Sequence, residues 1–276
     1  MRLAIAVVAT LLILVSAGHM ASAEAPPQRG GTVIIGMTND PPTVNPAITA
    51  GAPDRLIGCM VYEGLVRVEN GFHILPALAK SWEISPDGLS YTFRLVDAKW
   101  QDGTPFTSTD VRFSLQNINA KYGPLFAASG RVIASIEAPD PATAIIKLAH
   151  PFGPLLLSLS CDQNGAILPA HVFAGTDVLR NPATLAQPVG TGPFKLTEWV
   201  HGDHLTLERN PAYWRKDRPY LDEIVVKFLP NAASRVLALQ AGEIDYINEY
   251  SFPQSFFAAV AANKQLANRI QKRQWD

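Results

Sequence analysis

Residues 78–95 read LAKSWEISPDGLSYTFRL, and this stretch sets the expected fold class. Trp82 and Ile84 alternate with polar residues ahead of the turn segment Ser85-Pro86-Asp87-Gly88. After the turn, apolar residues again take every second position, at Leu89, Tyr91, Phe93 and Leu95. Two stretches of period two around such a turn predict a β-hairpin. We therefore expect Tyr91 and Phe93 to lie on its buried face.

The residues after this hairpin predict a helix. Thr107 and Asp110 have the spacing of a capping box. Apolar residues then recur at helical spacing, at Val111, Leu115 and Ile118. Another short amphipathic helix is expected to begin at Pro53-Asp54 and to be ended by Gly64. Pro154 indicates the start of a further helix, because proline is favoured in a first helical turn.

Other strands and hairpins are indicated at both ends of the chain. Strands are expected at 31–37, 224–228 and 244–247, hairpins around the turns at 139–141 and 201–203, and a helix at 232–241 closed by Gly242. Helices interspersed with hairpins predict an α/β or mixed α+β domain that contains a mixed sheet.

Two segments raise the question of ligand chemistry. In Val189–Phe194 (VGTGPF), Pro193 removes a backbone donor and no Gly-Lys-Ser/Thr follows, so we interpret the segment as a structural turn rather than a phosphate loop. His201 and His204 flank a predicted hairpin turn, and no other histidine has ligand spacing with them. We expect exposed turn residues there and no metal site.

No pattern in the chain indicates an enzyme. The sequence contains no Gly-x-Ser-x-Gly elbow and no HExxH helix, and neither cysteine has the local setting of a nucleophile. An acid–base pair of carboxylates requires a separation in space that sequence spacing does not define. We expect no catalytic residue and no cofactor, and an exported hydrolase is kept as the alternative.

The N-terminus is typical of a secretory signal peptide. Arg2 provides a positive charge, Leu3–Val15 form an apolar run, and Ala21-Ser22-Ala23 supply small residues for cleavage. The apolar run is too short to span a bilayer comfortably, which argues against a membrane anchor. We expect cleavage after Ala23 and a mature protein free in the periplasm. No cysteine adjoins the cleavage site, so a lipid anchor is not indicated.

The composition is that of a globular protein without a strong charge bias. The chain has 276 residues, 47% hydrophobic and 17% charged, with a formal net charge of −1. A partner of nucleic acid or anionic membrane would require a clustered basic excess, so neither is expected. Cys59 and Cys161 both lie among apolar residues, which favours two buried thiols, although an exported compartment permits a disulfide.

Several longer segments carry a more specific pattern. They are Leu78–Leu95, Trp100–Thr107, Pro188–Phe194, Leu207–Trp214, Pro219–Ile224 and Leu239–Asp245. In this order and at this spacing, they resemble the family 5 extracellular solute-binding proteins of ABC importers for oligopeptides, dipeptides, nickel complexes and related solutes. The resemblance runs from about residue 30 to about residue 247.

This resemblance implies a fold, a function and a site. The fold would be a class II periplasmic-binding-protein-like lobe with a mixed sheet, and the function would be capture of a peptide or similar solute by a monomer for a membrane permease. Ligand in the family lies between two lobes. The nearest counterparts of that site here are Thr38, Asn39 and Asp40 in one loop and Asn164 and Gly165 in another. An ordinary surface-loop role is the alternative for both loops.

The resemblance also raises a question of length, because family members are about twice as long as this chain. We therefore expect residues 24–276 to be an incomplete N-terminal lobe, with the second lobe and the returning segment missing. Such a chain would bind peptides weakly or not at all, because one wall of the cleft is absent. A lobe that serves as an interaction module without transport activity is a further alternative.

Overall fold

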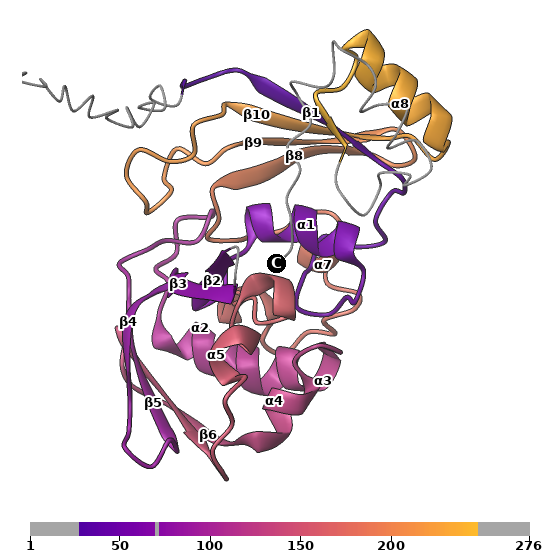
Figure 1. The fold of residues 1–276 in the computed structure, drawn as a ribbon. Helices are drawn as coiled ribbons and strands as arrows, with labels where there is room; N and C mark the ends of the chain where they lie inside the picture. Colours follow the sequence, from indigo (N-terminus) through magenta and orange to yellow (C-terminus); the bar gives the residue numbers. More distant parts are fainter. Residues whose placement is uncertain (1–27, 70–71, 248–276) are drawn as a thin grey trace, which may run out of the picture.

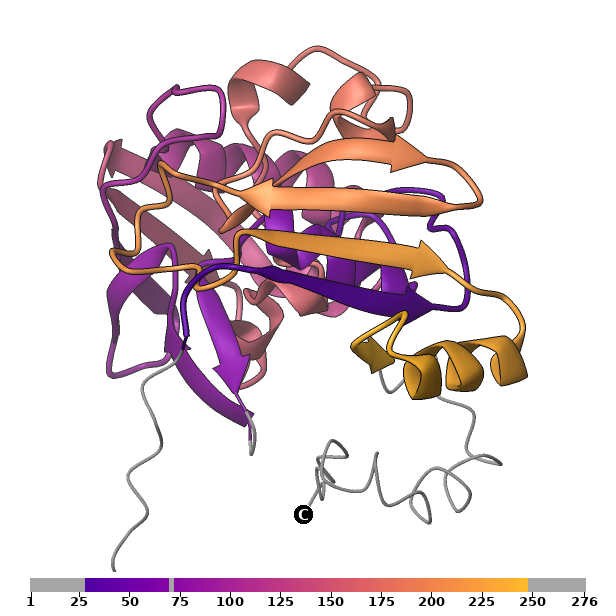
Figure 2. The ribbon, with the colours of Figure 1, turned by 90° about the horizontal axis from the view of Figure 1, so that it is seen from above.

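The structure is a computed structural model that describes residues 28–69 and 72–247. The expected signal peptide and its cleavage site at Ala23 lie outside the described residues. A five-stranded sheet has the order β11-β1-β10-β9-β8 (Figure 2). Its strands are β1 Thr32–Met37, β8 Phe194–Val200, β9 His204–Arg209, β10 Glu223–Phe228 and β11 Tyr246–Ile247. β1 runs parallel to β10 and β11, whereas β8, β9 and β10 are antiparallel, so the predicted mixed sheet is confirmed.

The quoted hairpin belongs to a second sheet, of order β4-β5-β7-β6. Its strands are β4 Ala79–Ile84, β5 Ser90–Leu95, β6 Ile133–Asp140 and β7 Thr143–Leu148. Tyr91 is 6% exposed and Phe93 is fully buried, which confirms their predicted face. Trp82 pairs with Phe93 across the strands, but Ile84 near the turn remains 47% exposed. The predicted hairpins around residues 139–141 and 201–203 are likewise present.

Most of the helices lie between the two sheets or pack against the four-stranded sheet (Figure 1). They are α1 Ala52–Val61, α2 Ser108–Phe113, α3 Ala120–Tyr122, α4 Ala127–Val132, α5 Leu155–Ser158, α6 Ala170–Phe173 and α7 Pro182–Leu185, together with a π-helical turn η2 Ser114–Asn119 and a 3₁₀ turn η3 Cys161–Gln163. A small hairpin of β2 Val66–Glu69 and β3 His73–Pro76 lies beside them. The remaining helix, α8 Ala232–Ala241, follows β10.

Most predicted helix boundaries are confirmed. The capping box of Thr107 and Asp110 begins α2, and Pro154 is the N-cap of α5. Gly242 ends α8 at a φ of 77°, a conformation that glycine adopts without a steric penalty. The final strand is shorter than expected and covers only residues 246–247.

Gly64 does not end α1, contrary to the prediction. The helix stops at Val61 because the backbone of the buried Tyr62 is already extended. A Cβ atom on Gly64 would lie 2.4 Å from the carbonyl oxygen of Leu159. Glycine is therefore required at position 64 for a close approach of two backbones, and not as a helix cap.

The prediction of two free thiols was wrong, because Cys59 and Cys161 form a disulfide. Their Cα atoms lie 5.8 Å apart, within the range that a disulfide spans. The bond joins α1 to η3. An apolar neighbourhood is compatible with a thiol or a disulfide, and only the packing of α1 against η3 distinguishes them.

In the described residues, two extensive hydrophobic clusters and a smaller one of Ala238, Ile244 and Ile247 form the core. One extensive cluster gathers around the four-stranded sheet and includes Phe93, Trp100 and Phe126. The other extensive cluster lies between the five-stranded sheet and α1 and includes Met37, Ile57 and Val226. Within the described residues, no helix is long and apolar enough to cross a membrane.

Candidate functional site

The predicted site residues Thr38, Asn39 and Asp40 begin the loop that joins β1 to α1, residues 38–51, which we call the β1–α1 loop. This loop leaves β1 at the end where Met37 pairs with Phe228, the last residue of the parallel strand β10. Ligands in open α/β sheets bind at the carboxyl ends of parallel strands. Asn39 is exposed there, whereas Thr38 is partly buried.

Asp40 fastens one end of the β1–α1 loop to the five-stranded sheet. Its carboxylate accepts hydrogen bonds from Trp199 Nε1 at 2.8 Å and from the backbone nitrogen of Gly202 at 2.9 Å. The Nδ1 atom of His201 lies 3.0 Å from the same carboxylate. The side chain of Asp40 therefore holds the loop against the β8–β9 turn.

Asn164 fastens the other end of the same loop. Its side chain is fully buried, and its Nδ2 atom donates to the carbonyl oxygens of Pro46 at 2.6 Å and Thr49 at 2.8 Å. Its Oδ1 atom accepts from the backbone nitrogen of Leu125 at 2.8 Å. One carboxamide thus joins three segments that are distant in the sequence.

The backbone of this asparagine is also unusual. Asn164 has a φ of 61°, in the left-handed region, where asparagine is enriched relative to most other residues. The adjacent Gly165 packs tightly, since a Cβ atom there would lie 2.4 Å from the carbonyl oxygen of Ser158. Backbone strain of this kind clusters at functional sites when the surrounding structure holds it in place.

We call the surface around this residue the Asn164 junction, formed by residues 45–51, 122–126 and 160–165. Tyr122 and Leu125 are each 40% exposed on it, and Ala50 is exposed. Thr49 donates to Asp54 at 2.7 Å, so the end of the loop is also tied to α1. The junction offers a rigid, partly apolar surface with backbone groups nearby. No local sequence signal marks Tyr122 and Leu125 as its members.

The structure does not bring all five predicted residues into one cluster. Asp40 lies at the β8–β9 turn, and Asn164 with Gly165 lies at the far end of the β1–α1 loop. The side chains of Asp40 and Asn164 are used in internal hydrogen bonds. Direct contact of the five residues with a ligand stays a prediction.

The two histidines lie beside carboxylates, the exposed His201 in the β8–β9 turn and the partly buried His204 at the start of β9. His201 faces Asp40, and His204 lies 2.7 Å from Asp203 and 3.3 Å from Glu198. The hydrogen bond to Asp203 is the main cause that raises the pKa of His204. Among residues 28–69 and 72–247, no group of three or more histidine, cysteine or carboxylate side chains could hold a metal ion.

The glycine-rich segment at 189–194 packs against the end of α1. A Cβ atom on Gly190 would lie 1.8 Å from the carbonyl oxygen of Val61, and the backbone nitrogen of Gly192 donates to that oxygen at 2.8 Å. Close approach of the chain thus explains these glycines. The structural turn predicted for this segment is confirmed.

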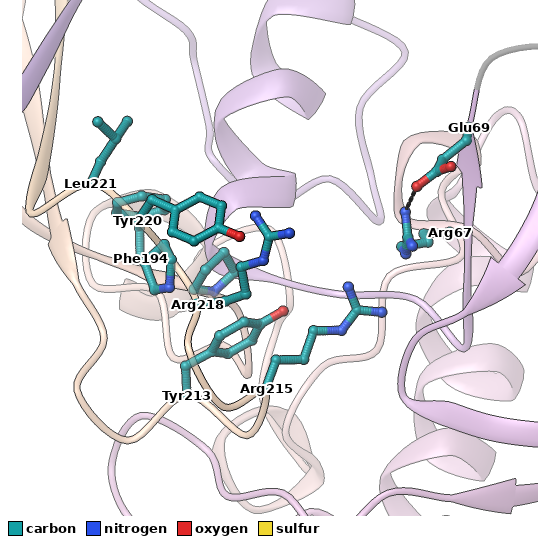
Figure 3. A pocket seen from close by; sticks show the side chains of 10 residues that line it. Arg67, Glu69, Phe194, Tyr213, Arg215, Arg218, Tyr220 and Leu221 are labelled. Carbon is teal, nitrogen blue, oxygen red and sulfur yellow. Dashed lines mark hydrogen bonds and ion pairs between the residues drawn. The ribbon is translucent and has the colours of Figure 1, made fainter. Parts of the chain in front are cut away.

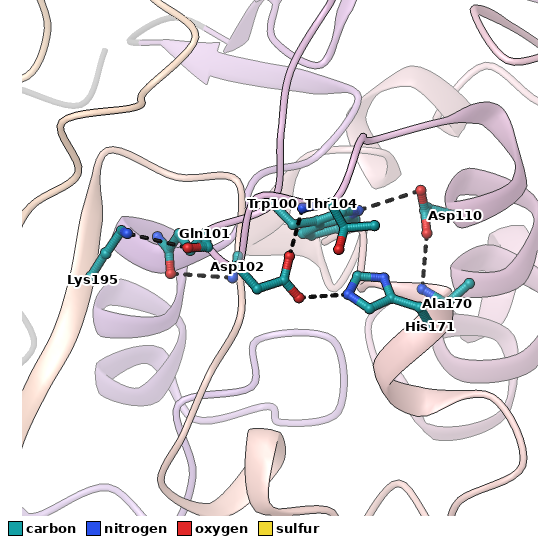
Figure 4. Close-up of polar contacts among 9 residues, drawn as sticks. Trp100, Gln101, Asp102, Thr104, Asp110, Ala170, His171 and Lys195 are labelled. Atoms are coloured by element: carbon teal, nitrogen blue, oxygen red, sulfur yellow. Dashed lines mark hydrogen bonds and ion pairs between the residues drawn. The ribbon is translucent and has the colours of Figure 1, made fainter.

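A histidine–carboxylate pair also occurs away from the β1–α1 loop. His171 Nε2 lies 2.6 Å from Asp102 Oδ2 and links α6 to the turn after Trp100 (Figure 4). Partial burial opposes ionisation of Asp102, but hydrogen bonds from His171 and Thr104 outweigh it and lower the pKa. In Figure 4, Asp110 accepts from Trp100 and from the backbone of Ala170. This network locks the 100–104 turn in place.

The fold is of the periplasmic-binding-protein class, as similar solved structures show. The model for bacterial extracellular solute-binding proteins, family 5, matches residues 73–275. The chain belongs to this family. Its resemblance to the family, noted from sequence segments, is therefore confirmed.

Individual relatives agree with this assignment. A putative ABC transporter peptide-binding protein of Brucella ovis is 36% identical over 87% of this chain and 46% of its own length. The probable D,D-dipeptide-binding periplasmic protein DdpA of Escherichia coli is 34% identical over 86% of this chain and 46% of its own. The chain thus spans about half the length of the curated relatives it matches.

Solved structures show the same fold. The Agrobacterium tumefaciens protein AgaA, in complex with agropinic acid, has a TM-score of 0.77 at 33% identity. The match covers 85% of this chain and 46% of the AgaA chain. Bacillus subtilis AppA, in complex with a nonapeptide, has a TM-score of 0.76 at 27% identity, with coverage of 87% and 47%. The predicted fold class is confirmed.

Proposed function

We propose that this chain is part of the substrate-binding component of an ABC importer for peptides or related solutes. The observation that carries the proposal is the match to relatives named as peptide-binding proteins over 87% of the chain. The relatives that match are solute-binding proteins, which does not favour the hydrolase alternative. The interaction module without transport activity has no supporting observation of its own.

The proposed solute-facing surface is the β1–α1 loop together with the Asn164 junction. Asp40 and Asn164 act as positioning residues that fix the two ends of the loop. Thr38, Asn39, Tyr122 and Leu125 are the proposed residues in reach of the solute, and the buried Gly165 supports the junction from within. A loop fixed at both ends loses little conformational entropy on binding, which favours affinity.

The proposed cellular setting follows from the N-terminal sequence and the family. A signal peptide at residues 1–23 would be removed, and the mature protein would begin at Glu24 in the periplasm. Its partner there would be the permease of the importer, which a monomer would reach by diffusion. N-terminal sequencing of secreted protein tests this, and retention of Met1 would contradict it.

Binding by the 276 residues alone is expected to be weak. The 276 residues align with 46% of the length of the Brucella ovis relative, and we propose that they supply only one part of the solute site. We expect dissociation constants above about 1 μM for di- to pentapeptides, since every 1.4 kcal/mol of lost contact weakens binding about tenfold. Isothermal titration measures this dissociation constant, and a value at or below about 1 μM would refute the expectation.

Nuclear magnetic resonance tests the proposed surface even when binding is weak. Peptides added at millimolar concentration should shift the backbone signals of Asn39, Ala50 and Leu125. Residues on the four-stranded sheet, such as Lys80, should not move. Peptide that is consumed with time would indicate the hydrolase, and shifts confined to other surfaces would contradict the proposed site.

A further inference from the structure

A pocket lies at the amino-terminal ends of β8 and β10, whereas the β1–α1 loop lies at the carboxyl ends of β1 and β10. This pocket has a volume of about 460 Å³ and lies between β2 and the segment 213–221 (Figure 3). Leu221 at its edge precedes β10, and Phe194 in its wall begins β8. The volume falls within the usual range for small-molecule sites. We call it the arginine pocket.

The residues that line this pocket include three arginines and only one carboxylate. Arg67 and Glu69 come from β2, and Arg215 and Arg218 come from the facing loop. Figure 3 shows the guanidinium groups of Arg215 and Arg218 extended toward the side where Arg67 lies. Like charges at close range repel, so an anion placed among them would be stabilised. Glu69 neutralises only Arg67, with which it forms an ion pair.

A tight turn brings two of the arginines together. The backbone nitrogen of Arg218 donates to the carbonyl oxygen of Arg215 at 3.3 Å, which closes a four-residue β-turn. Asp217, at the third position of the turn, has a φ of 66°, as a type II turn requires. Arg215 and Arg218 are the first and last residues of this turn, so their side chains project from the same part of the loop.

The loop that carries these arginines is held from behind. Tyr213 donates to Glu63 at 2.8 Å, and Trp214 Nε1 donates to the same carboxylate at 2.7 Å. Arg215 donates to the carbonyl oxygen of Pro76 at 2.8 Å and stacks on Trp214. The turn is thus rigidly placed before any ligand arrives, which reduces the entropy lost on binding.

The arginines retain unused hydrogen-bonding capacity. The Arg218 guanidinium stacks on the Tyr220 ring, 4.0 Å from its centroid, and its side chain has no hydrogen bond or ion pair with another described residue. The Nε atom of Arg67 is buried without a hydrogen-bond partner among the described residues. A guanidinium carries five donors in a fork that matches carboxylate and phosphate oxygens.

We propose that the arginine pocket binds a small organic anion through a carboxylate or phosphate group. This site lies at the opposite end of β10 from the β1–α1 loop, and it does not depend on the proposed function. The net positive charge of its lining favours a ligand with at least two negative charges.

Isothermal titration of the full chain with inorganic phosphate and with citrate, at low ionic strength, tests this proposal. We expect saturable binding at millimolar concentration or below, weakened by added salt. Binding of citrate alone would assign the site to carboxylates, and binding of phosphate alone would assign it to phosphates. Failure to observe saturable heat with either probe would overturn the proposal.

Three variants locate the binding. Arg218→Gln should weaken it about tenfold, since a hydrogen bond to a charged group contributes roughly 1.5–3 kcal/mol. Glu69→Gln should strengthen it, because a competing carboxylate is removed. Arg180→Gln is the matched control, since this side chain is 89% exposed and does not line the pocket.

The Arg218 side chain makes no hydrogen bond to a described residue, and the backbone hydrogen bond that closes the turn is kept in Arg218→Gln, so thermal unfolding of this variant should match the wild type. If anion binding were weakened equally in Arg180→Gln and Arg218→Gln, the anion would be attracted by the overall charge of the protein and not by the pocket. This outcome would also overturn the proposal. None of these outcomes bears on peptide binding at the β1–α1 loop, so either proposal can be refuted without refuting the other.

Discussion

Cys59 in α1 and Cys161 in η3 form a disulfide that spans 102 positions of the sequence. Closing a loop of that length restricts the unfolded chain strongly. Replacing both cysteines by serine should therefore lower the free energy of unfolding by about 4 to 5 kcal/mol. Urea unfolding of the wild type and the double variant, followed by circular dichroism, measures the difference.

Dithiothreitol provides the control for this prediction. It should destabilise the wild type to about the level of the double variant and leave the double variant unchanged. A loss below about 1 kcal/mol in both experiments would mean that the disulfide contributes little to stability.

The hairpin of β4 and β5 allows a matched comparison of two apolar residues. Phe93 is fully buried and Ile84 is 47% exposed on the same hairpin. Phe93→Ala should lower the free energy of unfolding by roughly 3–5 kcal/mol, and Tyr91→Ala by a similar amount. Ile84→Ala should cost less than about 1 kcal/mol, because little surface is removed from the core. Comparable losses at positions 84 and 93 would contradict the assigned faces.

Local rules predicted the parts of the fold that depend on neighbours in sequence. Alternation around Asp87-Gly88 gave the hairpin, and the spacing of Thr107 and Asp110 gave the start of α2. Each of these features arises from residues within a few positions of one another. The mixed character of the sheet followed from the mixture of such elements.

Features made by distant residues could not be predicted in the same way. Two such features are the parallel pairing of Thr32 with Glu223 and the disulfide of Cys59. Both depend on how the elements pack, and no local sequence pattern encodes that packing. Family resemblance pointed to Asn164, but its hydrogen bonds to Pro46 and Thr49 were visible only in the structure. The arginine pocket likewise joins β2 to a loop about 150 positions later.

Glu63 should make stability depend on pH. Burial raises its pKa above the ordinary value, although hydrogen bonds from Trp214 and Tyr213 and the charge of Arg215 oppose the shift. The folded state then binds the proton more tightly than the unfolded state. Stability is therefore lost as the pH rises from the unfolded pKa, about 4.3, toward the raised folded pKa.

The variant Glu63→Gln lacks this titration. The free energy of unfolding of the wild type, minus that of the variant, should fall with rising pH across this window and then stay level. Tyr213→Phe removes a hydrogen bond that lowers the pKa of Glu63, so in that background the fall should extend to higher pH. Urea unfolding measured from pH 4 upward tests both statements. A difference that grows with pH would mean that the ionised carboxylate is favoured in the fold.

Asn164 should be the most sensitive polar residue of the candidate site. Replacing it with alanine leaves the carbonyl oxygens of Pro46 and Thr49 and the backbone nitrogen of Leu125 without their partner. A buried group left unsatisfied costs about 1–3 kcal/mol, so we expect Asn164→Ala to lose at least about 3 kcal/mol of stability.

Two further variants separate the causes of that loss. Asn164→Gly also loses the hydrogen bonds but adopts a φ of 61° without strain, so it should be more stable than Asn164→Ala by about 1–2 kcal/mol. Asn210→Ala is the matched control, a buried asparagine that bonds Gly192 and Ala212 away from the junction. It should lower stability while leaving the peptide-induced shifts of Ala50 and Leu125 intact, whereas Asn164→Ala should abolish them. If Asn164→Ala kept those shifts, Asn164 would have no part in shaping the solute surface.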